Sequence, residues 1–255
     1  MLISASRRTD IPAFYADWLV NRLGTGFCSV KNPYNPNQIK RISLSPEEVD
    51  GIVLWTKNAT PLLPKLPALS AYNYYFQHTL TAYHPDIECG LQCDKNTIIA
   101  TFKEISAKIG AERMIWRYDP IVISPRYCSE YHIFAFEKLC KHLSGYTEKC
   151  VISFVLPYKS IVKNLAEFGN IIPTLQEKIE LVKRLLDISN TYKIELCACC
   201  EMPEIYELGV SPIACIDGNL LGTKKFAKDK NQRPGCNCAA SIDIGAYNSC
   251  PNGCR

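Results

Sequence analysis

The regular alternation of two kinds of segment along the chain constrains its fold more than any other feature. Short apolar runs of strand length occupy residues 2–6, 51–55, 72–81, 113–118, 149–155 and 194–199. Amphipathic segments of helix length occupy residues 12–23, 95–109, 129–143 and 174–191. This order is typical of a parallel sheet whose strands are connected by helical crossovers. It predicts an α/β fold, specifically a TIM-like or partial (β/α) barrel.

The chain after residue 221 departs from this pattern and suggests an appended segment. We expect a barrel body at residues 1–221, a basic connecting loop at 222–235 and a cysteine-rich, metal-binding tail at 236–255, all within a single domain. The loop contains one acidic residue, Asp229, and five basic residues, namely Lys224, Lys225, Lys228, Lys230 and Arg233. Such a run is typical of a solvated surface loop and also of a phosphate-binding segment.

Several classes of protein find no support in the sequence. The longest apolar runs fall far short of the roughly 20 residues that span a bilayer. The amino terminus lacks the charge-then-apolar order of a secretory signal, so we expect a cytoplasmic protein without membrane partners. A glycine-rich phosphate loop before a helix, a Gly-x-Ser-x-Gly elbow and a His-Glu-x-x-His helix are all absent. Nucleotide-loop, hydrolase and protease functions are therefore not indicated.

The cysteines are many and unevenly placed. Of the fourteen in the chain, eight follow residue 196, namely Cys197, Cys199, Cys200, Cys215, Cys236, Cys238, Cys250 and Cys254. In a reducing compartment, clustered thiols favour metal binding over disulfides, because thiolates are soft ligands for zinc and for iron–sulfur clusters. The distribution therefore predicts a metal site near the carboxyl end.

The tail alone contains enough thiols for one metal centre. Cys236-x-Cys238 and Cys250-x-x-x-Cys254 supply four thiolates, which suit a tetrahedral zinc site or a four-iron cluster. Zinc ribbons more usually carry two Cys-x-x-Cys pairs, so these spacings favour an iron–sulfur cluster and leave zinc as the alternative.

Two further cysteines are candidate metal ligands. Cys200 and Cys215 each neighbour a carboxylate close to an expected strand end. Strand alternation would place Cys197 and Cys199 on one face of the sheet and Cys200 on the other, so all three are not expected to serve one metal.

Polar residues follow every expected strand, where parallel barrels form their active sites. The candidates for substrate binding are Arg7, Arg8, Trp55, Lys57, Arg117 and Tyr118. The candidates for proton transfer, or for orienting the cations, are Asp10, Asp119 and Glu201. Guanidinium groups grip phosphate or carboxylate with two hydrogen bonds, so the set predicts a small anionic substrate. Alternatively, each cation forms an ion pair with a nearby carboxylate that stabilises the fold and has no role in substrate binding.

Five motifs together resemble a known bacterial family. They are residues 3–12 (ISASRRTDIP), 54–58 (LWTKN), 115–120 (IWRYDP), 215–217 (CID) and 229–254. The family is known as domain of unknown function 1848, and the resemblance spans nearly the whole chain. It implies an iron–sulfur or metal-binding tail on a barrel distantly similar to radical S-adenosylmethionine enzymes and the photoproduct lyase group. S-adenosylmethionine is thereby a further cofactor candidate.

These features predict an iron–sulfur barrel enzyme that carries out a redox or radical-type reaction on an anionic small-molecule or nucleotide-like substrate. An electron donor protein would be its partner. Two alternatives remain open from the residues alone. One is a nucleic-acid-binding module with a structural zinc tail, whose affinity would fall steeply with salt. The other is a zinc-stabilised enzyme without redox chemistry.

Overall fold

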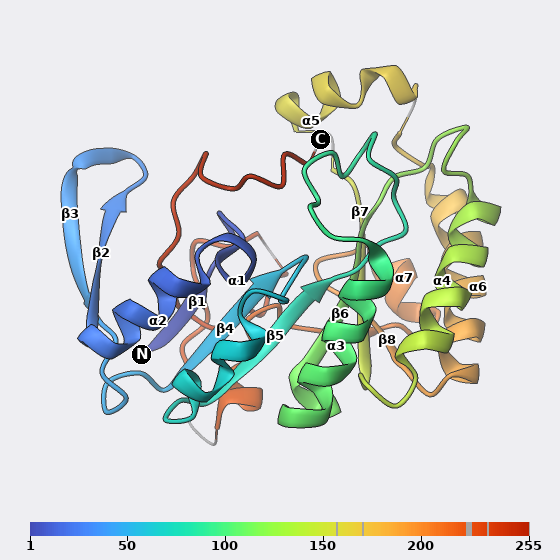
Figure 1. The fold of residues 1–255 in the computed structure, drawn as a ribbon. Coiled ribbons are helices and arrows are strands. Elements are labelled where there is room, and N and C mark those ends of the chain that lie inside the picture. Colours follow the sequence, from blue (N-terminus) through green and yellow to red (C-terminus); the bar gives the residue numbers. More distant parts are fainter. Residues whose placement is uncertain (157, 170, 223–225, 234, 255) are drawn as a thin grey trace.

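One parallel sheet organises the structure, a computed structural model that describes residues 1–156, 158–169, 171–222, 226–233 and 235–254 (Figure 1). Its eight strands lie in the order β10-β1-β4-β5-β6-β7-β8-β9. They are β1 (Leu2–Ala5), β4 (Gly51–Thr56), β5 (Tyr74–Thr79), β6 (Met114–Ile121), β7 (Lys149–Phe154), β8 (Glu195–Ala198), β9 (Ser211–Pro212) and β10 (Ile242–Asp243). The expected α/β fold with a parallel sheet is confirmed.

The sheet is open in the part of the chain that the structure describes. The strands at its two edges, β9 and β10, are two residues long and pair only with β8 and β1, respectively. A closed TIM-like barrel is therefore not observed. Of the two expected forms, the structure is compatible only with a partial barrel.

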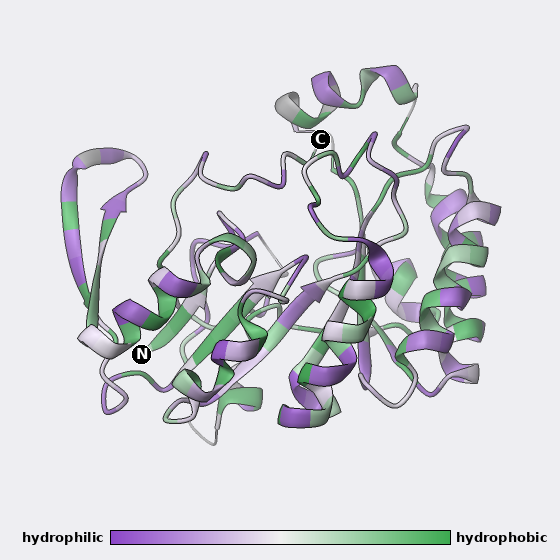
Figure 2. Cartoon of the chain, in the orientation of Figure 1, coloured by the Kyte–Doolittle hydropathy of each residue, from purple (hydrophilic) through white to green (hydrophobic). Residues whose placement is uncertain are grey.

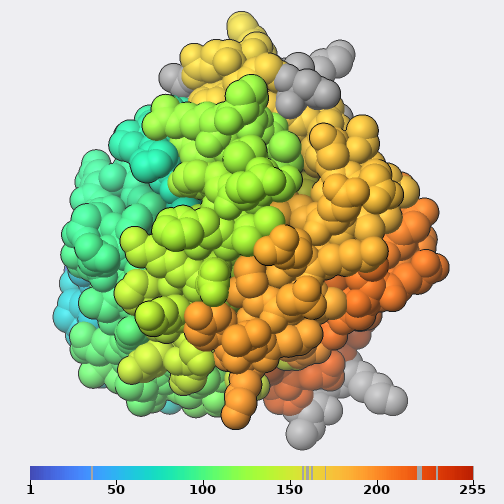
Figure 3. All heavy atoms as spheres, turned by 90° about the vertical axis from the view of Figure 1, so that its right-hand side faces the viewer, coloured from blue at the N-terminus to red at the C-terminus, as the bar shows by residue number. Residues whose placement is uncertain are grey.

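The four helical segments expected from the sequence are helical. The helices are α1 (Ile11–Phe14), α2 (Ala16–Thr25), α3 (Lys95–Ile109), α4 (Ser129–Leu143), α5 (Lys159–Asn164), α6 (Leu175–Thr191) and α7 (Pro203–Glu207), with 3-10 turns η1 (Leu63–Leu69), η2 (Ala111–Arg113), η3 (Ala166–Phe168) and η4 (Gly218–Leu221). The short helices α5 and α7 were not expected. The expected helix at 12–23 is divided at Tyr15 into α1 and α2. Helices α4 and α6 pack side by side, and Figure 3 looks onto the face that they form. No helix among the described residues is both long and apolar enough to cross a bilayer.

A hairpin that was not expected from the sequence stands apart from this sheet. Strands β2 (Phe27–Asn32) and β3 (Asn35–Ser43) pair with each other in antiparallel fashion and form a separate two-stranded sheet. In Figure 1 the hairpin projects beside α2. Polar residues interrupt both of its strands, which is why apolar runs did not reveal it.

Each face of the large sheet has its own core. On the outer face, residues such as Phe76 and Trp116 pack against the helices, and the apolar sides of these helices turn toward the sheet (Figure 2). On the inner face, Val53, Tyr75 and Val151 pack against residues that follow β9, including Cys236 and Cys238. The carboxyl-terminal segment therefore covers the inner face. The expected division into body, loop and tail stays a prediction, and Lys224 and Lys225 of the basic loop lie outside the described residues.

Candidate metal centre and strand-end pocket

Five thiols from three separate segments converge beside the inner face of the sheet. The Sγ atoms of Cys199, Cys200 and Cys236 lie within 4.8 Å of one another, and so do those of Cys199, Cys215 and Cys238. We call these five residues the thiol group. Cys199 belongs to both sets of three and is therefore its centre. Among the described residues, no carboxylate or histidine joins either set.

Backbone hydrogen bonds explain why these distant segments meet. Cys199 directly follows β8, and the Ile213 amide donates to the Ala198 carbonyl at 3.0 Å, which leads the chain toward Cys215. The Ala239 amide then donates to the Ile216 carbonyl at 2.9 Å and holds Cys238 next to that segment.

Side chains of β5 fix the backbone of Cys215. The Tyr75 hydroxyl and the Gln77 amide both donate to the Cys215 carbonyl, each at 2.9 Å. Because both donors come from one rigid strand, the position of Cys215 is set by the sheet and not by a loop alone.

Charge at the thiol group concentrates on Cys215. Hydrogen bonds from the Cys199 and Cys238 thiols, together with the Arg117 guanidinium, hold the pKa of Cys215 well below its usual range. Arg117 Nη1 lies 3.4 Å from Cys215 Sγ. The pKa of Cys199 is raised, because its thiol serves as a hydrogen-bond partner of Cys215 and Cys238. Because the pKa of Cys238 is raised as well, Cys215 is favoured as the thiolate among Cys199, Cys215 and Cys238.

The donor set and its spacing fit a thiolate-bound metal. Thiolates are soft ligands that select zinc, copper(I) and iron–sulfur clusters. With a zinc–sulfur bond of about 2.3 Å, neighbouring sulfurs of a tetrahedral site lie about 3.8 Å apart. Cys199 Sγ and Cys200 Sγ are 3.7 Å apart, so this pair already has the separation that one shared metal ion requires.

Four of the six cysteines expected as metal ligands belong to the thiol group, and two do not. Cys250 and Cys254 join neither set of three among the described residues. They line the pocket at the strand ends instead, near Cys89. The Sγ of Cys89 donates to the Gly253 carbonyl at 2.6 Å. The four tail thiols thus do not form one four-thiolate group. The fold explains this, because residues 236–238 cover the inner face whereas residues 250–254 run past the ends of β1 and β4.

Cys199 is the member of the thiol group that sequence reasoning missed. Strand alternation was expected to separate Cys199 from Cys200, but β8 already ends at Ala198. Cys200 then adopts a φ of 57°, in the left-handed region that non-glycine residues rarely enter. This turn replaces the alternation of the strand and brings the two neighbouring thiols together.

The strand ends form a pocket of about 300 Å³ next to the thiol group. Five of the residues predicted to act at the strand ends line it, namely Arg7, Arg8, Asp10, Trp55 and Lys57. Trp55 connects the two features, because its ring lies 5.9 Å from the Arg7 guanidinium carbon and 5.4 Å from that of Arg117. Arg117 in turn contacts Cys215, so only two side chains separate the pocket from the thiol group.

One cation of this pocket, Lys57, is held by a buried ion pair. Although burial disfavours the charged form, ion pairing with Glu88 raises the pKa of Lys57. The Lys57 Nζ to Glu88 distance is 2.6 Å, and Lys95 pairs with the same carboxylate. One buried carboxylate is therefore shared by two ammonium groups, which leaves a net positive charge beside the pocket.

The three carboxylates expected to transfer protons all have structural partners. Asp10 accepts from the amides of Ala13 and Lys57 at 3.1 and 2.7 Å and from Asn252 Nδ2 at 3.1 Å. Burial is the main cause of its raised pKa. Asp119 pairs with Arg117. Glu201 accepts from the Phe154 amide at 3.2 Å and lies 3.9 Å from Lys178 Nζ. These contacts join neighbouring segments, and proton transfer by the three residues stays a prediction.

Tyr118 is a correction to the expected substrate-binding set. Its side chain is fully buried in the outer core, where its hydroxyl lies 2.9 Å from Nδ1 of His132. Because neighbouring strand residues face opposite sides of the sheet, Arg117 on the inner side requires Tyr118 to point outward. Tyr118 therefore packs under the helices and does not line the strand-end pocket.

Fold and site together define an α/β protein with an open parallel sheet and a group of thiols at its inner face. The sequence model of the family described as Domain of unknown function (DUF1848) matches residues 2–255, so the chain belongs to this family, as its motifs predicted. Among solved structures, the chain is similar to HydG, a maturase of the FeFe-hydrogenase, with a TM-score of 0.47 and 12% sequence identity. The match covers 77% of this chain and 42% of that chain, so this chain spans less than half of its length. No curated protein matches.

Proposed function

We propose that this protein is a metal-dependent redox enzyme whose thiol group holds an iron–sulfur cluster and whose strand-end pocket binds a small anionic substrate. The observation that carries the proposal is the convergence of five thiols from three distant segments, with Sγ atoms within 4.8 Å of one another in two overlapping sets. Cysteines buried only as hydrophobic side chains have no reason to gather in this way.

The charge around the thiols favours iron and sulfide over a structural zinc ion. Structural zinc sites and iron–sulfur clusters are each held by four ligands, so the five thiols of the thiol group are enough for either. Clusters are tuned by hydrogen bonds to their sulfurs, and Arg117 is positioned to donate one to Cys215 Sγ. When bound, such a cluster would supply one-electron transfer, for which an electron donor protein is the expected partner.

The substrate would bind through the cations of the strand-end pocket. Arg7 and Arg8 come from the loop after β1 and present guanidinium groups, which bind phosphate or carboxylate in a bidentate manner. The anion would lie next to Trp55, and the Trp55 and Arg117 side chains would separate it from the sulfurs of the thiol group. S-adenosylmethionine stays a further proposal for the same pocket.

Metal analysis of protein purified without oxygen tests the proposal. We expect iron and acid-labile sulfide in the wild-type protein and their loss in Cys199→Ser and Cys238→Ser. Cys140→Ser is the matched control, because Cys140 is fully buried in the outer core on α4, outside the thiol group. Iron retained by both thiol-group variants, or protein with neither metal nor sulfide, would contradict the assignment.

Zinc is the second candidate, and one distance favours it. The separation of 3.7 Å between Cys199 Sγ and Cys200 Sγ matches the sulfur–sulfur edge of a tetrahedral zinc site. About one zinc per chain, without sulfide and without visible colour, would make the thiol group structural. The chemistry would then rest on the strand-end residues alone.

A further inference from the structure

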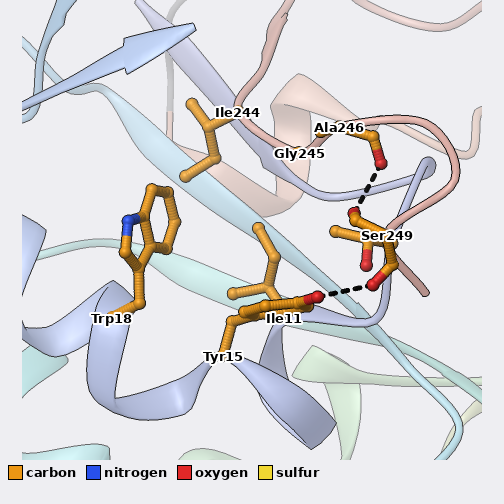
Figure 4. A pocket seen from close by; sticks show the side chains of 8 residues that line it. Ile11, Tyr15, Trp18, Ile244, Gly245, Ala246 and Ser249 are labelled. Atoms are coloured by element: carbon orange, nitrogen blue, oxygen red, sulfur yellow. Dashed lines mark hydrogen bonds between the residues drawn. The ribbon is translucent and has the colours of Figure 1, made fainter. Parts of the chain in front are cut away.

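A second cavity of about 230 Å³ lies between the first two helices and the carboxyl-terminal segment (Figure 4). Its walls are mostly apolar and include Ile11, Tyr15, Trp18 and Ile244. The first three come from α1, its junction with α2, and α2 itself, and Ile244 directly follows β10. We call this space the ring cavity.

The polar groups at the rim of the ring cavity have partners within the protein. The Tyr15 hydroxyl donates to the Ser249 carbonyl at 2.5 Å, and Ser249 Oγ donates to the Ala246 carbonyl at 2.7 Å (Figure 4). These bonds fasten the segment 246–249 over α1 and close one side of the cavity. The rim is therefore held by hydrogen bonds within the protein and does not depend on a bound molecule.

The Thr9 hydroxyl is the exception among these polar groups. Thr9 lines the ring cavity, its side chain is 6% exposed, and its Oγ1 has no hydrogen-bond partner among the described residues. Buried hydroxyl groups are nearly always hydrogen-bonded in folded proteins, because burial removes the water that would otherwise bind them. Protein atoms cover this oxygen in the conformation shown, so a turn of the Thr9 side chain toward the cavity would let a ligand atom complete its hydrogen bonding.

The ring cavity and the strand-end pocket are neighbours. Thr9 lines both of them. Arg8, which lines the strand-end pocket, also donates from Nη1 to the carbonyl of Gly245, which lines the ring cavity, at 3.4 Å. A ligand could thus place a charged end among the arginines and an apolar end against Trp18, with Thr9 between the two.

We propose that the substrate is an anion that carries an apolar ring and that this ring binds in the ring cavity. The inference rests on the anion-binding pocket of the proposed function and adds the substrate class. The size is suitable, because an apolar cavity of about 150 Å³ in another protein holds benzene. Apolar and aromatic walls with a few placed polar groups are typical of small-molecule sites. The Thr9 hydroxyl would bond to the polar atom that joins the ring to the anion.

Binding of two phosphate esters tests this inference on the metal-loaded protein as purified. Phenyl phosphate and methyl phosphate carry the same anionic group, and only the first has a ring. Isothermal titration should give a dissociation constant at least about tenfold lower for phenyl phosphate. Phenyl phosphate, but not methyl phosphate, should quench the tryptophan fluorescence of the wild-type protein. This quenching should be absent in Trp18→Phe, which would locate the ring next to Trp18.

Variants separate the two parts of the site. Trp18→Ala should bring the two affinities close together while binding of methyl phosphate is unchanged, and Thr9→Val should weaken phenyl phosphate without altering the fold. Phe134→Ala is the control, because this exposed aromatic on α4 lies on another face. Equal affinity of both esters for the wild-type protein would refute ring binding in the ring cavity but would not contradict anion binding in the strand-end pocket. Binding of neither ester would overturn both, and metal content, measured separately, would show whether the thiol group survives that result.

Discussion

Replacing Gly90 by alanine tests how the carboxyl-terminal segment is held at the strand-end pocket. A Cβ atom on residue 90 would lie 2.3 Å from the Asn252 carbonyl oxygen and 2.4 Å from that of Pro251. Both obstacles are backbone atoms, so no side-chain rotation relieves the contact. Because non-bonded carbon contacts are favourable only near 3.5 to 4.0 Å, the segment around Asn252 must retreat by roughly 1 Å or more.

The cost follows from the hydrogen bonds that this retreat breaks. The Gly90 amide donates to the Asn252 carbonyl at 2.8 Å, and Asn252 Nδ2 donates to the Asp10 carboxylate at 3.1 Å. A neutral hydrogen bond contributes about 0.5–1.5 kcal/mol and one to a charged group about 1.5–3 kcal/mol. We therefore expect Gly90→Ala to destabilise the attachment of residues 250–254 by about 2–4 kcal/mol.

Amide hydrogen exchange at residue 90 measures this attachment directly. Since about 1.4 kcal/mol corresponds to a factor of ten, exchange should be faster by about thirtyfold to a thousandfold. Gly24→Ala is the matched control, because Gly24 lies inside α2 and a Cβ there meets no atom within 4 Å. That control should be stabilised by about 0.5–1 kcal/mol. Unchanged exchange at residue 90 in folded Gly90→Ala would refute the close approach of these two segments.

Two further predictions concern buried titratable groups. Burial lowers the pKa of His78 to about 3, below its unfolded value of about 6.5, so the unfolding free energy should fall as pH drops below 6.5. Between pH 7.5 and 5.5 the loss is about 1.4 kcal/mol, to be measured by urea unfolding, and His78→Phe should remove this part of the pH dependence. Arg117→Leu leaves the carboxylate of Asp119 without its ion-pair partner and should cost about 3–5 kcal/mol, whereas Arg117→Leu combined with Asp119→Asn should recover part of that loss in the same assay. A double variant no more stable than Arg117→Leu would contradict the pairing.

The elements that the sequence predicted well are those defined by local periodicity. Strands β4 to β8 and helices α3, α4 and α6 were expected within about four residues of their observed ends, because apolar spacing reports which side of each element is buried. The hairpin β2–β3 was missed because it buries little and carries no continuous apolar run. Whether the sheet closes depends on contacts between residues far apart in sequence, which periodicity does not report.

In the candidate site, too, some features followed from local sequence rules and others did not. That polar residues of β1 and β4 would meet followed from the rule that parallel strands end at one edge, and Arg7, Arg8, Trp55 and Lys57 do line one pocket. The partition of the cysteines did not follow from any local rule. Cys199 and Cys200 come together through one left-handed residue, and Cys250 separates from Cys236 because of the path taken by the chain between them.

The contacts by which the carboxyl-terminal segment covers the sheet also bring its cysteines to the thiol group. The inner face of an open sheet needs a cover, and Cys236 and Cys238 provide part of it by packing against Val53, Tyr75 and Val151. Those two cysteines also join the thiol group with Cys199 and Cys215, which follow strands β8 and β9. A metal bound by thiols from both sides would therefore connect the cover to the sheet, and its binding free energy would add to the stability of the inner core. Because Arg117 and Trp55 lie on the same face, this connection would also fix the wall that the strand-end pocket shares with the thiol group.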